Sequence, residues 1–307
     1  MMFGASLAFG QTYPDRPIRM LVGFAPGGNS DTVARIVAPR LGERLGQPLV
    51  IDNRGGAAGN IAAELAAKAA ANGYTILMGS SSNTVNASLY PRLPFDMTKD
   101  YAAVTLVSSA PFALVVNSAT PLASVRELIA FARSKPGQLN YASSGATSHL
   151  ATELFMIMAG IRAVNVPYKS SGLAISDLLG GQVAMMFSAL PAALPHVNSG
   201  RLRALGVTSG RRLESAPDLP TVAESGLPGY EVAQWSGVLA PAATPGNIVA
   251  RLQQEIAQIM KLPDVKERLA ALGLEARSNT SREFASYLQD DIKKWAKVVR
   301  ESGVRLE

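Results

Sequence analysis

The first hundred residues alternate short apolar runs with helix-like segments, and this alternation restricts the fold more than any other feature. The apolar runs, over 18–24, 49–53 and 75–78, are typical of buried strands, and each leads into a turn rich in Gly, Ser or Asn. Helical periodicity fills the intervals, over 31–45 and 60–71. Because strand–helix–strand order requires right-handed crossovers, neighbouring strands must be parallel. The sequence therefore predicts an α/β fold.

Local signals suggest where these two helices begin and end. Residues 29–31 offer N-caps for the first helix, and Asn60 is expected to cap the second, with Gly73 as its C-terminal stop. Pro39 lies inside the first helix and removes one internal hydrogen bond. We therefore expect Pro39 to kink or shorten that helix.

The same alternation resumes after a break near residues 91–100, and the last third is helical. Further strands are predicted over 113–116, 139–142, 164–166, 183–187 and 202–207. Helices are predicted over 125–133 (capped by Ser124), 149–159, 245–260, 264–272 and 281–302. A chain of 307 residues is long enough for about two domains, so we predict two α/β lobes.

Composition argues against several classes of function. The net charge is +6, but aromatic residues make up only 6% and no basic run is interleaved with them, so no nucleic-acid partner is expected. The cationic stretch Lys293, Lys294, Lys297 and Arg300, like the pair Asp290–Asp291, is interpreted as the solvated face of the last helix. The chain has no cysteine and only two histidines, so no metal is expected.

The N-terminus has features of a secretory leader. Residues 1–9 are apolar, and Ala8-Phe9-Gly10 before Gln11 has small–x–small spacing, although no Lys or Arg precedes the run. We interpret residues 1–11 as a residual signal peptide or a disordered leader; the alternative is the frayed tail of a cytoplasmic protein. Since no later apolar run reaches about 18 residues, no membrane insertion is expected.

Five loops follow predicted strands and are rich in Gly, Ser, Ala or Asn: 25–31, 54–60, 79–83, 143–149 and 187–191. Ligands of open α/β sheets bind beyond the carboxyl ends of strands, and free N–H groups at helix N-termini suit a carboxylate or phosphate. Together the loops predict one anion-binding crevice. Taken singly, each loop can also be a plain turn, and the loop at 54–60 lacks both the complete Gly-x-Gly-x-x-Gly and a P-loop.

Long ordered motifs add a resemblance to a known family. They include YPDRPIRMLVGFAPGGNSD, LGQPLVIDNRGGAAGNIAAE, VPYKSSGLAISDLLGGQV and WSGVLAPAATP, and the likeness runs from Tyr13 to about Val304. The chain closely resembles the Bug-type receptors, the substrate-binding components of tripartite tricarboxylate transporters. The resemblance implies a type II periplasmic binding-protein fold, with crossing strands near 103–108 and 234–239. Lobe 1 would then comprise 12–106 and 240–307, and lobe 2 would comprise 107–239.

The resemblance also implies which residues contact the ligand, a carboxylate held by loop amides and hydroxyls without cofactor or metal. In the first lobe these are Phe24, Ala25, Pro26, Gly27, Gly28, Asp31, Ser80, Ser81, Ser82 and Asn83. In the second lobe they are Ser144, Gly145, Ala146, Thr147, Ser148, His149, Tyr168, Ser188, Ala189 and Leu190. The compact SSGATSH loop and Ser170, where the family often has Gly, depart from its pattern, so the ligand's identity stays open.

The function predicted from these observations is that of a non-enzymatic periplasmic receptor. It would be a monomer that closes on a small carboxylate and passes it to integral-membrane transporter subunits. One alternative is a ligand-sensing binder without a permease. The other is a hydrolase that uses His149 as general base in the same cleft, although the chain has neither Gly-x-Ser-x-Gly nor Ser-x-x-Lys.

Overall fold

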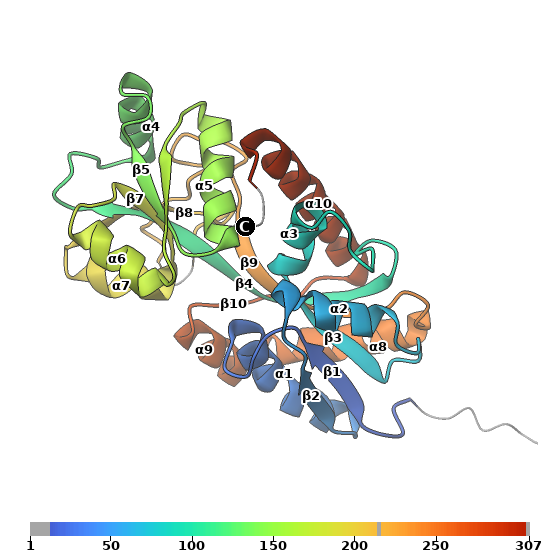
Figure 1. The fold of residues 1–307 in the computed structure, drawn as a ribbon. Helices are drawn as coiled ribbons and strands as arrows, with labels where there is room; N and C mark the ends of the chain where they lie inside the picture. The colour runs from blue at the N-terminus through green and yellow to red at the C-terminus, as the bar shows by residue number, and fades with distance from the viewer. Residues whose placement is uncertain (1–12, 214–215, 305–307) are drawn as a thin grey trace, which may run out of the picture.

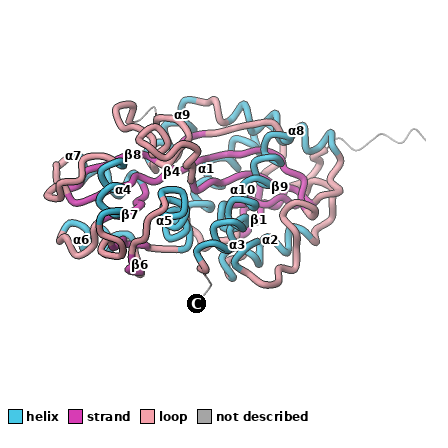
Figure 2. The backbone as a smooth tube through the Cα atoms, turned by 90° about the horizontal axis from the view of Figure 1, so that it is seen from above, coloured by secondary structure: helices cyan, strands magenta, loops and turns pink. Residues whose placement is uncertain are grey.

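The computed structural model describes residues 13–213 and 216–304, and the strands of this part form two sheets that one shared strand joins into a continuous curl, with helices on both sides (Figures 1 and 2). The strands are β1 (Ile18–Val22), β2 (Leu49–Asn53), β3 (Thr75–Ser80), β4 (Tyr101–Asn117), β5 (Asn140–Ser143), β6 (Val164–Pro167), β7 (Met185–Ala189), β8 (Leu202–Val207), β9 (Ala233–Pro241) and β10 (Glu275–Ala276). Their main order is β2-β1-β3-β9-β4-β7-β5-β6, and both β8 and β10 pair with β4.

Helices connect most of the strands and make up the C-terminal third. They are α1 (Asn29–Leu45), the short 3-10 turn η1 (Ala57–Gly59), α2 (Asn60–Ala67), α3 (Ser81–Leu89), α4 (Val125–Ser134), α5 (Ala146–Ala159), α6 (Ser171–Leu179), α7 (Leu190–Asn198), α8 (Gly246–Ile259), α9 (Pro263–Ala271) and α10 (Ser281–Ser302). Among the helices of residues 13–213 and 216–304, none combines the length and apolar character needed to cross a bilayer. The predicted leader, residues 1–11, lies outside the described residues.

Two long antiparallel strands join the two lobes of the molecule (Figure 1). Parallel β1, β2 and β3 form the first sheet with β9, whereas parallel β5, β6 and β7 form the second. The strand β4 pairs with β9 along residues 101–111 and with β7 and β8 along 112–117. One strand of 17 residues therefore belongs to both sheets, and the predicted α/β fold with two lobes and crossing strands is confirmed.

Each sheet has an apolar core on both of its faces. Along β4, Leu114 and Val116 pack into one cluster and Ala113 and Val115 into another, because successive side chains of a strand point to opposite faces. The helices α8 and α9 pack on the first lobe, where Leu252 shares a cluster with β1 and α1. The last third of the chain thus returns to the lobe in which the chain begins. The domain boundaries at residues 106 and 240 stay a prediction.

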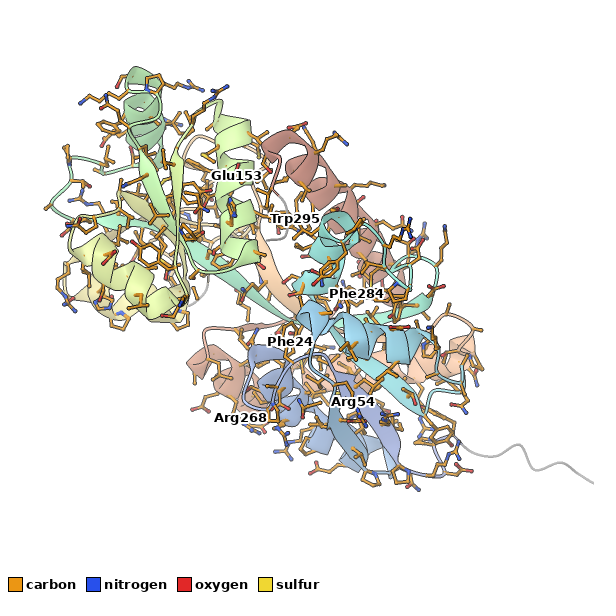
Figure 3. All side chains as sticks on the ribbon, viewed as in Figure 1. Phe24, Arg54, Glu153, Arg268, Phe284 and Trp295 are labelled. Carbon is orange, nitrogen blue, oxygen red and sulfur yellow. The ribbon has the colours of Figure 1, made fainter. Side chains whose placement is uncertain are left out.

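The helix α10 contacts both lobes. Near its start, Phe284 packs into a core of the first lobe, whereas Trp295 and Val298 pack into a core of the second. Figure 3 shows Phe284 and Trp295 well separated along this helix. Val85 of α3 belongs to the same second-lobe cluster, so α3 and α10 together cover the junction between the lobes.

The prediction that Asp290 and Asp291 lie on a solvated face is wrong for Asp291, which is only 4% exposed. Its carboxylate accepts hydrogen bonds from the Thr84 hydroxyl at 2.6 Å and the Trp235 indole N–H at 3.2 Å. Lys294, predicted to be solvated, pairs with the same carboxylate at 2.7 Å. The reason is tertiary: α3 and β9 cover the side of α10 that carries Asp291.

Most predicted elements lie close to those of the structure, but three helix ends are wrong: the N-cap of α1 and both ends of α2. The helix α1 runs on through Pro39 to Leu45, so it is not shortened. Its N-cap is Gly28, outside the predicted 29–31. Asn60 is the first residue of α2, not its cap, and the helix ends at residue 67, well before Gly73. These helix ends depend on the conformation of the neighbouring loops, which apolar periodicity does not predict.

Candidate ligand-binding site

Three helices begin at one cavity between the lobes. The cavity has a volume of about 180 Å³ and is lined by Phe24, Gly28, Asn29, Ser30, Ser80, Ser81, Ser82, Thr147, Gln234 and Trp235. These residues include the first turns of α1 and α3, from the first lobe, and of α5, from the second. Figure 2 shows α3 and α5 side by side at the centre of the molecule. The cavity therefore has walls from both lobes and from the crossing strand β9.

The chemistry of this cavity suits an anion although none of its lining residues is charged. The first backbone N–H groups of a helix lack partners within the helix, and the helix dipole places about half a positive charge at that end. Hydroxyl groups of Ser81, Ser82 and Thr147 add further donors close to the same backbone groups. A carboxylate or phosphate can be held by such groups without an arginine or lysine.

The loop before α1 is held by a buried carboxylate. Asp31, 1% exposed, accepts hydrogen bonds from the Gly27 N–H at 2.8 Å, Arg35 Nε at 2.8 Å and Asn53 Nδ2 at 2.9 Å. Arg35 above all lowers the pKa of Asp31 to about 2, although burial opposes the shift. The carboxylate is therefore ionised, and its oxygens are occupied by these three donors. It stabilises the loop that places Gly28 at the cavity.

Part of the same predicted loop does not line the cavity. Ala25, Pro26 and Gly27 are exposed and are not among the lining residues. The Phe24 carbonyl accepts a hydrogen bond from Asn53 Nδ2 at 2.9 Å, and the Phe24 ring packs on Gly59 at the start of α2. Figure 3 shows Phe24 at the edge of the first lobe that faces the second. Of the predicted loop contacts, Phe24 and Gly28 reach the cavity.

Two side-chain hydrogen bonds fix the first turn of α3, whose serines line the cavity. Ser80 is the N-cap, and its N–H donates to Asn83 Oδ1 at 2.9 Å. Asn83 is buried and occupied by this bond, so it does not line the cavity. One turn further along, Thr84 donates to Asp291 of α10. The first turn of α3 is thus fixed on two sides, with Ser81 and Ser82 left at the cavity wall.

The loop before α5, in the second lobe, is held by hydroxyls instead of a carboxylate. The Ser148 hydroxyl accepts from the Ser144 N–H at 3.1 Å and donates to the Gly145 carbonyl at 3.0 Å. The Ser144 hydroxyl lies 2.9 Å from that of Ser171. Thr147 alone of this loop lines the cavity, and Ala146 does not. The second lobe therefore brings one hydroxyl where the first brings several.

Two other predicted contacts in the second lobe turn toward their own lobe. His149 Nε2 lies 3.3 Å from Glu153 Oε1, which also accepts a 2.7 Å hydrogen bond from the Tyr141 hydroxyl (Figure 3 labels Glu153 on α5). Tyr168 donates to Asp177 at 2.7 Å, and this bond raises the pKa of Tyr168 to about 12. Neither His149 nor Tyr168 lines the cavity, so His149 is not placed to act as a base there.

The last group of predicted contacts lies beside the cavity. Ala189 and Leu190, at the start of α7, line an adjoining cavity of about 270 Å³. Ser188 is buried and donates to the Ala189 carbonyl at 3.2 Å. The structure therefore brings six predicted residues to the first cavity and two to the second, while the others brace loops, lie exposed or are buried: Phe24, Gly28, Ser80, Ser81, Ser82 and Thr147, then Ala189 and Leu190.

Four residues that line the cavity were not predicted as ligand contacts, and one loop predicted to bind the anion does not reach the cavity. Asn29 and Ser30 belong to a predicted loop, and their place in the first turn of a helix was the available signal. Gln234 and Trp235 lie on β9, far along the chain, and no local signal marks them. The predicted anion loop at 54–60 does not line the cavity; the Ala58 carbonyl instead accepts from Asn86 of α3. Among the described residues, no group of three His, Asp or Glu side chains could hold a metal ion.

Two α/β lobes joined by crossing strands around an uncharged, donor-lined cavity define a two-lobed solute-binding protein. The particular family is shown by comparison: the profile of the tripartite tricarboxylate transporter family receptors matches residues 33–304, so the chain belongs to that family. The fold is accordingly a type II periplasmic binding fold.

The relatives are similar over nearly their whole length. BugT of Bordetella pertussis is 41% identical over 96% of this chain and 92% of its own. A solved protein of R. palustris, with adipate, is 37% identical with a TM-score of 0.75, over 95% of this chain and 99% of the other. MatC of Rhodopseudomonas palustris, with bound malate, is 32% identical with a TM-score of 0.71, over 94% of this chain and 100% of the other. The predicted resemblance to Bug-type receptors is thereby confirmed.

Proposed function

We propose that this protein is a periplasmic receptor that encloses a small carboxylate between its lobes and delivers it to the membrane subunits of a tripartite tricarboxylate-type transporter. The observation that carries the proposal is the meeting of three helix N-termini, from two lobes, at one uncharged cavity. The solved relatives with adipate and malate support a carboxylate ligand. Membership of a transporter receptor family and the leader-like spacing before Gln11 support the location and the permease partner.

Energetics favours binding by both lobes together. Association costs at least ~4 kcal/mol, and a micromolar dissociation constant needs a net gain of about 8 kcal/mol. A hydrogen bond to a charged group contributes about 1.5–3 kcal/mol net. Two donors from one loop therefore fall short, whereas α1, α3 and α5 together supply enough. The ligand accordingly stabilises the arrangement in which the second lobe lies closed over the first.

No catalytic step is part of the proposal. A hydrolase would need a base within hydrogen-bond reach of a bound substrate, and His149 lies against Glu153, outside the cavity lining. The hydroxyls of Ser81, Ser82 and Thr147 have no histidine or lysine beside them among the lining residues. The site holds an anion and leaves it unchanged.

A thermal-shift screen against a panel of carboxylates tests the function. A ligand at 100 times its dissociation constant should stabilise the folded protein by about 2.7 kcal/mol. The fluorescence of Trp235, in the cavity wall, should change with the same ligands. If no carboxylate of the panel shifts unfolding or fluorescence, the receptor proposal is wrong.

A pair of substitutions tests the site. Ser81→Ala combined with Thr147→Ala removes one hydroxyl from each lobe and should weaken carboxylate binding ~10- to 100-fold, with little change in unfolding. The matched control is Thr120→Ala combined with Ser278→Ala, which also removes two hydroxyls but outside the cavity. Calorimetric titration measures both. Equal affinities in the two double variants would refute the placement of the site.

A further inference from the structure

The cavity at the three helix N-termini continues into a second one. The two cavities, of about 180 and 270 Å³, are both lined by Asn29 and Gln234. Because they share residues of α1 and β9, a molecule that fills the first can extend into the second. The second cavity therefore bears on which ligands the first accepts.

The two cavities differ in chemistry. Apart from Asn29 and Gln234, the second cavity is lined by apolar residues and one glycine, from three segments: 110–112 of β4, 189–192 at the start of α7 and 272–274 before β10. These segments come from both lobes and from a crossing strand. We name this cavity the apolar subsite. Apart from Asn29 and Gln234, which line both cavities, its walls offer contact to a hydrocarbon group and no polar side chain to a second anionic group.

One large apolar side chain of this wall, Leu272, is exposed to solvent. Its side chain is 44% exposed although it lines a concave site. Covering such a leucine with a hydrocarbon removes apolar surface from water on both sides, at roughly 25 cal/mol per Å². A third cavity of about 540 Å³ adjoins the apolar subsite, but charged residues line part of it: Arg211, Lys266 and Glu275. The apolar path therefore ends there, and the subsite of about 270 Å³ limits the length of the chain it can receive.

We infer that the apolar subsite receives the hydrocarbon tail of a carboxylate whose charged end lies at the N-termini of α1, α3 and α5. The ligand class is therefore a carboxylate with an apolar chain or ring, distinct from acids that are polar throughout. This inference rests on the proposed function, because it needs the carboxylate to be held in the first cavity. It adds that chain length governs affinity.

The experiment compares straight-chain monocarboxylates in one titration series: acetate, butyrate and hexanoate. Each buried methylene contributes about 0.8 kcal/mol, so affinity should rise about fourfold for each one added. Leu272→Gln places an amide in the apolar wall and should reduce the advantage of hexanoate over acetate about fivefold. Ala192→Leu narrows the subsite from its other side and should cut the same advantage.

Leu65→Gln is the matched control, because Leu65 of α2 is also 44% exposed but lies outside all three cavities. Unfolding in urea checks that every variant is folded. A chain-length advantage that falls in the Leu272 and Ala192 variants, and persists in the control, supports the inference. Equal affinities for acetate and hexanoate overturn the inference and leave the receptor function intact. Failure of all three acids to bind overturns the inference, and the receptor function falls with it only if the carboxylate panel also leaves unfolding unchanged.

Discussion

The two sides of the ligand cavity are built differently. On the first-lobe side, two helices begin at the cavity, and the loop before α1 is fixed by the ionised Asp31. On the second-lobe side, α5 begins alone, and hydroxyl groups of Ser144 and Ser148 hold its loop. Charged hydrogen bonds are roughly twice as strong as neutral ones. The difference teaches that the first-lobe loop is held by charge-assisted hydrogen bonds, whereas the second-lobe loop is held by weaker neutral ones.

The largest expected effect comes from removing each brace. Asp31→Ala should lower the free energy of unfolding by about 3 kcal/mol, because three donors lose a charged acceptor in a buried place. Ser148→Ala, in the weaker loop, should cost only about 1 kcal/mol. Urea unfolding measures both. Equal losses in the free energy of unfolding would show that the loop of the first lobe is held no more strongly than that of the second.

The pH dependence of this loss identifies its source. The pKa of Asp31 in the folded protein, about 2, lies below its ordinary value of 3.8, so folding favours the ionised form. Its contribution is therefore complete above pH 3.8 and is lost as the pH falls through 2. The difference between wild type and Asp31→Ala should be constant above about pH 5 and shrink by about 2 kcal/mol towards pH 2. A constant difference over that range would mean that the charge is not responsible.

A smaller effect is expected where the lobes touch. A β-carbon at Gly273, before β10, would lie 1.8 Å from Cγ of Pro191 at the start of α7. Gly273→Ala should therefore push the lobes apart and cost about 2 kcal/mol more than Gly160→Ala. Gly160 is the matched control, since its φ of 62° is close to the 69° of Gly273 and its surroundings are open. Urea unfolding and small-angle scattering measure the cost and the separation. Equal costs would show that the contact is not tight.

The smallest expected effect compares the backbone conformations of the loops before α1 and α5, each at one glycine. Gly145, before α5, has φ 149° and ψ 167°, a region open almost only to glycine, whereas Gly27 has φ 83°. A β-carbon at either position would meet no atom within 4 Å. Gly145→Ala should therefore cost about 1 kcal/mol more than Gly27→Ala in urea unfolding. The reverse order would place the more constrained backbone in the first lobe.

Most strands and helices could be predicted from short stretches of the sequence. The predicted strands at 49–53 and 202–207 and the helix at 281–302 have the observed bounds. Apolar periodicity and flanking turn residues specify such segments without help from distant parts of the chain. The Ser124 cap is likewise local, and its hydroxyl accepts from the Glu127 N–H as expected.

The site depends on contacts that no local pattern contains. Asp291 looks like half of a solvated acidic pair until α3 and β9 cover it. Trp235 reaches the cavity because β9 pairs with both β3 and β4. Asp31 was predicted as a ligand contact from a motif, but its oxygens are taken by Gly27, Arg35 and Asn53. Sequence reasoning therefore located the loops and not the role of each side chain within them.

The position of α10 has a consequence for how the chain folds during synthesis. Thr84 meets Asp291 across a sequence separation of 207 residues, and Trp295 and Val298 fill a core whose other buried members lie between residues 85 and 232. Neither lobe can complete its packing until the last helix leaves the ribosome. Contacts of such long range form late and slowly. A chain built in this way stays incompletely packed until its synthesis ends.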